Sequence, residues 1–153
     1  MDKKELVKSI LDDLLHHFDI KPQTDISVDG DENIKISIQG DDLSFLIGYR
    51  GQSLDALQSI LTHIYYKKSN EWPVLLLDIN DYNSQRIERL HSIARRSIDK
   101  VRFFQSEVIL PYMNPWERRQ VHTLISEYDD VISESQGEGR NRRVHLKPKN
   151  KTS

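Results

Sequence analysis

The 153-residue chain contains no cysteine, which excludes disulfide bonds, thiolate zinc sites, iron–sulfur clusters and a cysteine nucleophile. No run of apolar residues approaches the roughly 18 that a membrane span needs, and the first residues do not lead into a signal-peptide core. We therefore expect a cytoplasmic protein without direct membrane insertion. The length suits one domain of ordinary size or two small ones.

The formal net charge of −2 hides an asymmetry between the two halves of the chain. Residues 1–81 hold 8 Lys and Arg against 15 Asp and Glu, a net charge of −7. Residues 82–153 hold 14 against 9, a net charge of +5, and ten of these 14 are Arg. Because the planar Arg side chain pairs bidentately with phosphate, this asymmetry indicates two modules and a polyanionic partner.

The first half has the hydrophobic pattern of a small module of helices and strands. Apolar residues at helical spacing predict a helix over residues 3–19, and alternating residues predict a β-hairpin with its turn at residues 29–32. A short helix over residues 41–47 precedes a Gly-x-x-Gly loop at residues 48–51, and a longer helix follows. The apolar run at residues 73–79 predicts a strand that is buried on both faces.

This order of elements, with the Gly-x-x-Gly loop between two helices, resembles a type II KH domain over residues 1–81. Glycines let the backbone approach a phosphate closely, and the following helix directs its unpaired N–H groups at the loop. The resemblance implies a nucleic-acid-binding loop made of Gly48, Tyr49, Arg50, Gly51 and Gln52. We expect an apolar groove beside it, lined by Ile47, Leu54, Ile36 and Ile38. Alternatively, the glycines serve only the geometry of a helix–turn–helix corner.

The second half begins with a long helix, predicted over residues 83–104. Its apolar stripe consists of Ile87, Leu90, Ala94, Ile98 and Val101. On a helical wheel, Arg86, Arg89, Arg96 and Lys100 lie opposite this stripe. Two interpretations of these cations stay open: a solvated helix face, or a basic track for a polyanion.

Further along, Asn114-Pro115 predicts the start of a second helix, preceded by a strand at residues 107–110. Arg118 and His122 are four residues apart on this helix and therefore share one face. Two strands, at residues 131–135 and 143–146, are joined by a Gly-rich turn that carries Arg140.

The Arg-x-x-x-His pattern of this helix, with its flanks at residues 113–119 and 135–144, resembles the R-3-H domain. That resemblance implies a surface for single-stranded nucleic acid formed by Arg118, Arg119, His122, Arg140, Arg142 and Arg143. A type II KH domain followed by an R-3-H domain resembles the bacterial Jag family (SpoIIIJ-associated proteins). Many members also carry an N-terminal Jag domain, whereas this sequence starts at the first KH helix.

We therefore predict an α+β fold of two small modules: a KH domain over residues 1–81 and an R-3-H domain over residues 82–147, followed by a basic disordered tail over residues 148–153. The predicted function is non-catalytic binding of single-stranded RNA, as a post-transcriptional regulator, with no cofactor and no metal. The resemblance further implies a link to cell elongation, division or sporulation and a small KH-only protein partner. Single-stranded DNA as a ligand and the oligomeric state stay open.

Two other functions remain as alternatives. The first is a protein-interaction adaptor whose contact with RNA is secondary. The second is a metal-independent ribonuclease that uses His122, Arg118 and a second histidine such as His145. Acid–base cleavage needs two poised groups around one phosphate, and the sequence offers few candidates for the second group.

Overall fold

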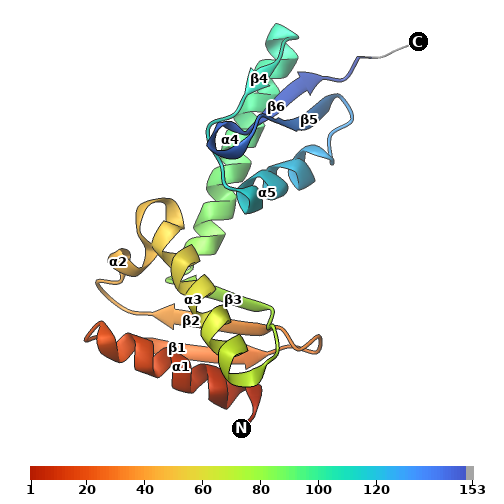
Figure 1. Ribbon diagram of the computed structural model, residues 1–153. Coiled ribbons are helices and arrows are strands. Elements are labelled where there is room, and N and C mark those ends of the chain that lie inside the picture. The colour runs from red at the N-terminus through yellow and green to blue at the C-terminus, as the bar shows by residue number, and fades with distance from the viewer. Residues whose placement is uncertain (151–153) are drawn as a thin grey trace. The chain divides into compact units, whose positions relative to one another are not determined.

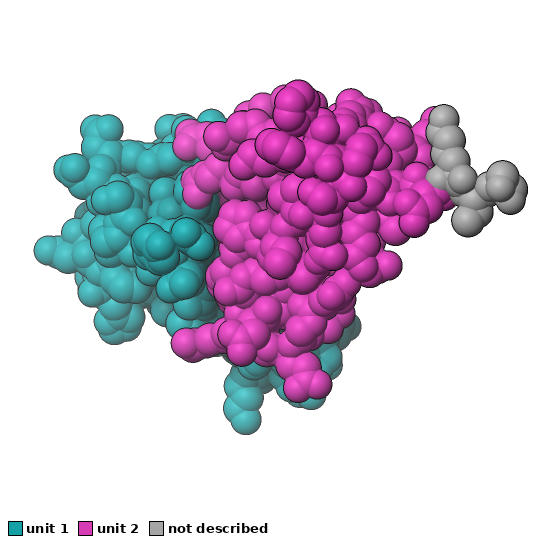
Figure 2. Space-filling model, turned by 90° about the horizontal axis from the view of Figure 1, so that it is seen from above, with its two compact units in different colours: residues 1–83 teal, residues 84–153 magenta. Residues whose placement is uncertain are grey.

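The structure is a computed structural model that describes residues 1–150. The chain divides into two compact units on either side of residue 83, and Figure 2 shows the described part of the first in teal and of the second in magenta. Each unit combines helices with a three-stranded β-sheet (Figure 1). The predicted α+β class with two small modules is confirmed.

The first unit follows the order of elements that the sequence predicts. Its elements are α1 (Lys3–His17), β1 (Gln23–Val28), β2 (Ile34–Gln39), α2 (Ser44–Ile47), the single turn η1 (Tyr49–Gly51), α3 (Gln52–Ser69) and β3 (Leu75–Ile79). The strand order is β1-β2-β3, with β1 antiparallel and β3 parallel to β2. Helices α1 and α3 pack their apolar residues, such as Leu11 and Leu61, against one face of the sheet.

The expectation that the strand at residues 73–79 is buried on both faces is wrong. In β3, Leu75, Leu77 and Ile79 are buried, whereas Leu76 is 51% exposed. The reason is that the core covers only one face of the sheet, on the side of α1 and α3, and the central strand β2 alternates in the same way. The strand therefore alternates like any half-buried strand, and its apolar outer residue faces solvent.

The second unit consists of α4 (Tyr82–Phe104), whose first two residues belong to the first unit, β4 (Val108–Ile109), α5 (Pro115–Ile125), β5 (Val131–Gln136), the turn η2 (Gly139–Asn141) and β6 (Arg143–Pro148). The strand order is β4-β6-β5, and both pairs are antiparallel. Its core joins Leu90 and Ile98 of α4 to Val121 of α5 and Leu146 of β6.

The start of α5 has the capping that the sequence predicts. The Asn114 side chain accepts a hydrogen bond from the Glu117 backbone N–H at 2.8 Å, and the Glu117 carboxylate accepts one from the Asn114 N–H at 3.0 Å. Pro115 occupies the first turn, where a missing N–H costs nothing. This capping box fixes where α5 begins and thereby the positions of Arg118 and His122 on its surface.

Arg86 does not lie on the solvated face of α4 where the helical wheel places it. It is only 4% exposed, its Nε donates to Glu117 Oε1 at 3.0 Å, and its guanidinium lies over the Trp116 ring at 5.1 Å. A buried cation needs such partners. Arg86 precedes the buried Leu90 by one helical turn, so it faces α5 and not solvent.

The predicted boundary between the two modules and the predicted start of the C-terminal tail differ slightly from the structure. The compact units divide after residue 83, because Tyr82 packs against the core of the first unit and Asn83 hydrogen-bonds to Leu77 and Asp78. The predicted tail over residues 148–153 overlaps the end of β6, and the Lys149 N–H donates to the Asp130 carbonyl at 2.9 Å. Residues 151–153 of that tail lie outside the described residues.

Within residues 1–150, none of the helices combines the length and the apolar character that crossing a membrane requires.

Candidate nucleic-acid interface

The Gly-x-x-Gly loop connects α2 to α3 in a conformation that only glycine can adopt at its first position. Gly48 has φ +71° and ψ −173°, and a Cβ atom built there would lie 2.2 Å from Ser53 Oγ. Gly51 has φ +77° and is buried directly before α3. The two glycines therefore allow the chain to fold tightly back onto the first turn of α3.

The two residues between these glycines project into solvent. Tyr49 is 71% exposed, and the Arg50 guanidinium lies 5.2 Å from the centre of its ring. Arg50 itself has φ +53°, a left-handed conformation that is uncommon for a residue with a side chain. Such strained residues often mark functional loops. The pair offers an aromatic face and a cation at the same point of the surface.

The N-terminus of α3 begins directly after the loop. No side chain caps it, and the Gln52 N–H donates to the Tyr49 carbonyl. The Gln52 side chain is exposed. The positive end of the helix dipole therefore points at the loop, where an anion such as a phosphate is favoured.

The predicted apolar groove beside the loop is not formed by the expected residues. Leu54, Ile36 and Ile38 are each at most 2% exposed, because they belong to the core between α3 and the sheet. Ile47 packs against the same core and is half-buried. These side chains support the loop from the core of the unit. The aromatic side chain that the loop itself exposes for stacking is Tyr49.

In the second unit, the structure brings Arg118, His122 and Arg142 into one cluster between α5 and β5. His122 Nδ1 lies 2.6 Å from Ser133 Oγ. Arg118 donates to the Met113 carbonyl at 2.7 Å, and Arg142 donates through Nε to Ser135 Oγ at 2.7 Å. A second Arg142 nitrogen donates to the Gly137 carbonyl at 3.0 Å. Each cation is thus oriented by one or two hydrogen bonds and retains further N–H donors.

The charges of this cluster act on its histidine. Burial lowers the pKa of His122 below the ordinary value of 6.5, and the positive charges of Arg118 and Arg142 lower it further. His122 is therefore neutral at pH 7, and an anion placed between the two guanidinium groups would favour its protonated form. The arrangement places two cations beside a polar, uncharged histidine.

The other predicted residues of this surface lie around the cluster or away from it. Arg119 is exposed on α5, and Arg140 is exposed on η2. Arg143 lies over the Tyr112 ring at 5.2 Å and donates to the Arg140 and Arg142 carbonyls. Because side chains alternate along β6, Arg143 and the cluster lie on opposite faces of the sheet.

Sequence reasoning missed the two serines that orient the cluster. Ser133 and Ser135 both contact its basic residues from β5. Their signal was their spacing, since residues two apart on a strand face the same side.

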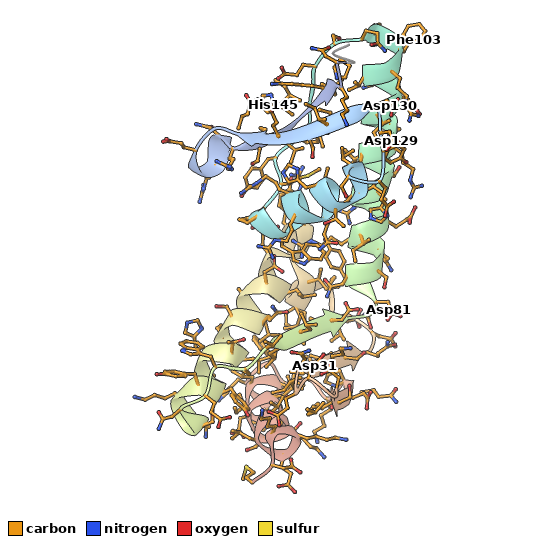
Figure 3. All side chains as sticks on the ribbon, turned by 90° about the vertical axis from the view of Figure 1, so that its right-hand side faces the viewer. Asp31, Asp81, Phe103, Asp129, Asp130 and His145 are labelled. Atoms are coloured by element: carbon orange, nitrogen blue, oxygen red, sulfur yellow. The ribbon has the colours of Figure 1, made fainter. Side chains whose placement is uncertain are left out.

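His145 lies on the opposite face of the sheet from His122. In the β5–β6 register, Ser133 pairs with Leu146 and Glu134 pairs with His145. His145 also bonds to Glu107, and Figure 3 shows it on the side of the sheet away from α5. The two histidines therefore cannot act together on one phosphate, as an acid–base ribonuclease mechanism would require.

Comparison with known proteins identifies a domain family for each unit. Residues 4–76 match the family model of the KhpA/KhpB KH domain, and residues 88–148 match that of the R-3-H domain. The resemblance of the two halves to a KH domain and an R-3-H domain is thereby confirmed.

Several curated proteins are similar to this chain over both domains, and each is named RNA-binding protein KhpB. The protein of Clostridium symbiosum is 37% identical over 117 residues, which cover 74% of this chain and 53% of that protein. The Bacillus subtilis protein is 27% identical over 133 residues, covering 85% and 64%. The Streptococcus pneumoniae serotype 2 protein is 28% identical over 141 residues, covering 90% and 40%. The chain thus spans about half the length of the curated relatives it matches.

Proposed function

We propose that this chain, in which a KH domain of the KhpA/KhpB type is followed by an R-3-H domain, is a member of the Jag family and binds single-stranded RNA through both domains. One observation carries the proposal: each compact unit presents, on its surface, the residues of its own nucleic-acid-binding motif. These are the loop with Tyr49 and Arg50 in the first unit and the cluster of Arg118, His122 and Arg142 in the second. The names of the similar proteins support the same ligand.

In the KH domain, the loop clamps the phosphate backbone of about four nucleotides. The glycines admit the backbone closely, the positive end of α3 attracts phosphate, and Arg50 adds a mobile charge. Tyr49 provides the exposed ring on which an unpaired base stacks.

In the R-3-H domain, Arg118 and Arg142 pair with phosphate oxygens, and neutral His122 donates or accepts a hydrogen bond at the sugar–phosphate backbone. Arg119 and Arg140 extend the positive surface around the cluster. These contacts are sequence-independent, so they supply affinity while base contacts elsewhere supply selectivity.

The division of charge supports a contribution from both domains. The first unit carries a net charge of −7 and binds a polyanion weakly by itself, whereas the second unit carries +5. When two weak sites are joined on one chain, the second contact becomes intramolecular and overall affinity rises.

We further propose a cytoplasmic, non-catalytic role as a post-transcriptional regulator, linked to cell elongation, division or sporulation. The separation of His122 from His145 across the sheet supports a binding role over cleavage. A second candidate function, protein-interaction adaptor, is favoured by the acidic first unit, which offers a surface to a small KH-only partner.

The test is a fluorescence-anisotropy titration of a degenerate ssRNA of about 12 nucleotides, which is about three times the length that a KH loop holds. Duplex RNA and ssDNA of the same length are titrated alongside at several salt concentrations. Salt-dependent binding that prefers single strands is the expected result. Absence of binding to every pool at low salt would contradict the proposal and favour the adaptor.

A further inference from the structure

One face of α3 is exposed along the whole helix and leads away from the Gly-x-x-Gly loop. Gln52, Ala56, Ser59, His63 and Tyr66 are spaced alternately by four and three residues, so they share this face, and all five are exposed. The helix has 18 residues and is about 27 Å long. Four of the five side chains are small or polar, so no bulky apolar side chain of this face precedes Tyr66.

At the end of this face, three rings form an exposed aromatic cluster. Trp72 stacks on Tyr66 with ring centroids 4.1 Å apart and an interplanar angle of 8°, and His63 contacts the Trp72 ring edge-to-face at 5.4 Å. Trp72 is 61% exposed and Tyr66 is 37% exposed. What distinguishes Trp72 from a single exposed ring is that it is continuous with Tyr66 and His63 on one helix face, and contiguous exposed patches mark interaction sites.

The turn between α3 and Trp72 is held by hydrogen bonds. Asn70 ends the helix with φ +61°, and its N–H donates to the Tyr66 carbonyl at 2.8 Å. The Ser69 hydroxyl donates to the Tyr65 carbonyl at 2.9 Å and accepts from the Glu71 N–H at 3.1 Å. The indole is therefore preorganised against α3 before any ligand arrives, which lowers the entropic cost of stacking.

One cation next to the aromatic cluster suits a phosphate backbone. Lys67 is exposed in the last turn of α3, one turn after His63, whereas Lys68 lies on the other side with Tyr65 and Glu71. Glu71 follows in the turn, but its charge acts on Lys3 and Tyr65, on the side of α3 that faces the core. Aromatic planes flanked by cations are the usual components of a surface for single-stranded nucleic acid.

We propose that Trp72, held against Tyr66, is a second stacking site for an unpaired RNA base, on a strand that continues from the Gly-x-x-Gly loop along the exposed face of α3. Lys67 neutralises a phosphate of the same strand. This inference rests on the proposed function and extends the binding site of the first unit beyond the four nucleotides that such a loop holds.

The chain offers a direct optical test, because it contains two tryptophans and Trp116→Phe leaves Trp72 as the sole indole. RNA binding is followed by the anisotropy of a labelled 12-nucleotide ssRNA (about three times the length held by the loop), and Trp72 emission is recorded in the same titration. Stacking of a base on the indole quenches its emission at the same RNA concentration at which anisotropy rises.

Three variants provide the matched comparison. Trp72→Leu retains apolar packing on Tyr66 but removes the ring, and we expect RNA affinity to fall by about 5-fold or more. Trp72→Tyr keeps an aromatic plane and retains affinity within about 2-fold. Phe103→Leu removes an aromatic side chain that is 82% exposed at the C-terminal end of α4 (Figure 3), and affinity stays unchanged. Circular dichroism and a thermal melt verify that each variant is folded.

The outcomes separate this inference from the proposed function. Normal anisotropy binding with unquenched Trp72 emission and full affinity of Trp72→Leu would overturn the stacking site while the proposed function stands. Trp72 emission that changes with protein concentration without RNA would assign the cluster to contacts between copies, and would also overturn it. Absence of RNA binding both in the unmodified chain and in the Trp116→Phe protein would overturn the proposed function itself.

Discussion

At the scale of one residue, the backbone conformation of the Gly-x-x-Gly loop requires a glycine at residue 48. Its positive φ and the 2.2 Å approach that a Cβ would make to Ser53 Oγ both exclude a side chain. Gly30 is different, because a Cβ there meets nothing within 4 Å. The two glycines are therefore chemically equal but differ in what the fold requires of them.

Gly48→Ala should lower the free energy of unfolding by about 1–3 kcal/mol through strain at positive φ and the clash with Ser53. RNA affinity should also fall, because the loop must shift to relieve the clash. Gly30→Ala is the matched control and should change stability by less than about 1 kcal/mol. Urea unfolding measures both, and equal stabilities of the two variants would show that the loop does not need glycine at residue 48.

The environment of His122 makes stability depend on pH with a definite sign. Burial first, and then the charges of Arg118 and Arg142, lower its pKa in the folded chain. As pH falls below about 6.5, His122 is therefore protonated more readily in the unfolded chain than in the folded chain. The free energy of unfolding decreases as a result. Above that pH both forms are neutral at His122 and the effect vanishes.

His122→Gln should remove this contribution, so the difference in unfolding free energy between pH 7 and pH 5 should be smaller than in the unmodified chain. The other five histidines are present in both proteins, so the comparison isolates the contribution of His122. Urea unfolding at the two pH values provides the measurement. An identical pH dependence in both proteins would mean that His122 titrates normally.

At the scale of elements, a buried ion pair connects α4 to α5. Arg86 donates to Glu117 at 3.0 Å and lies over Trp116, with its side chain 5% and that of Glu117 13% exposed. Glu117 also belongs to the capping box of α5. The same carboxylate thus fixes the start of the helix that carries Arg118 and His122 and the packing of that helix on α4.

Arg86→Ala should destabilise the second unit by about 3 kcal/mol, because it leaves a largely buried carboxylate without its cation. Arg95→Ala removes an exposed pair with Glu88 on the same helix and should cost at most about 1 kcal/mol. Thermal unfolding followed by circular dichroism compares the two. If Arg95→Ala were as destabilising as Arg86→Ala, the ion pair would not be the reason.

Most elements could be predicted because their patterns are local. The Asn114-Pro115 start of α5 and the alternation around the hairpin turn depend on neighbouring residues alone. The errors involve long-range packing: Leu76 is exposed because the core covers only one face of the sheet, and Arg86 is buried because α5 supplies Glu117. Leu54 was assigned to a groove because periodicity identifies an apolar side but not whether a core or a ligand covers it.

In the candidate site, too, the sequence predicts local motifs but not the tertiary contacts between them. The resemblance identified the loop and the Arg118/His122 pair. Arg142 directly precedes β6 and Arg143 is its first residue, so these sequence neighbours project to opposite faces of the sheet. The role of Ser133 required the β5–α5 packing, and the stack of Trp72 on Tyr66 required the turn at Asn70. No periodicity encodes these tertiary contacts.

At the scale of the whole molecule, two compact units of opposite net charge share one chain. The first carries −7 and the second +5, and each presents a different motif. A polyanion is therefore attracted mainly by the second unit, and in the proposed function the loop of the first adds a second contact to the same strand. Joined on one chain, the two contacts reinforce each other through effective concentration.

The most direct measurement compares the affinity for one ssRNA of four proteins: the unmodified chain, Tyr49→Asp with Arg50→Asp, Arg118→Ala with His122→Ala, and all four changes together. We expect each pair of changes to weaken binding, the R-3-H pair to flatten the salt dependence by about 0.7 per lost phosphate contact, and the combination to abolish binding. Affinity and salt slope that remain unchanged in both double variants would contradict RNA binding by these two domains.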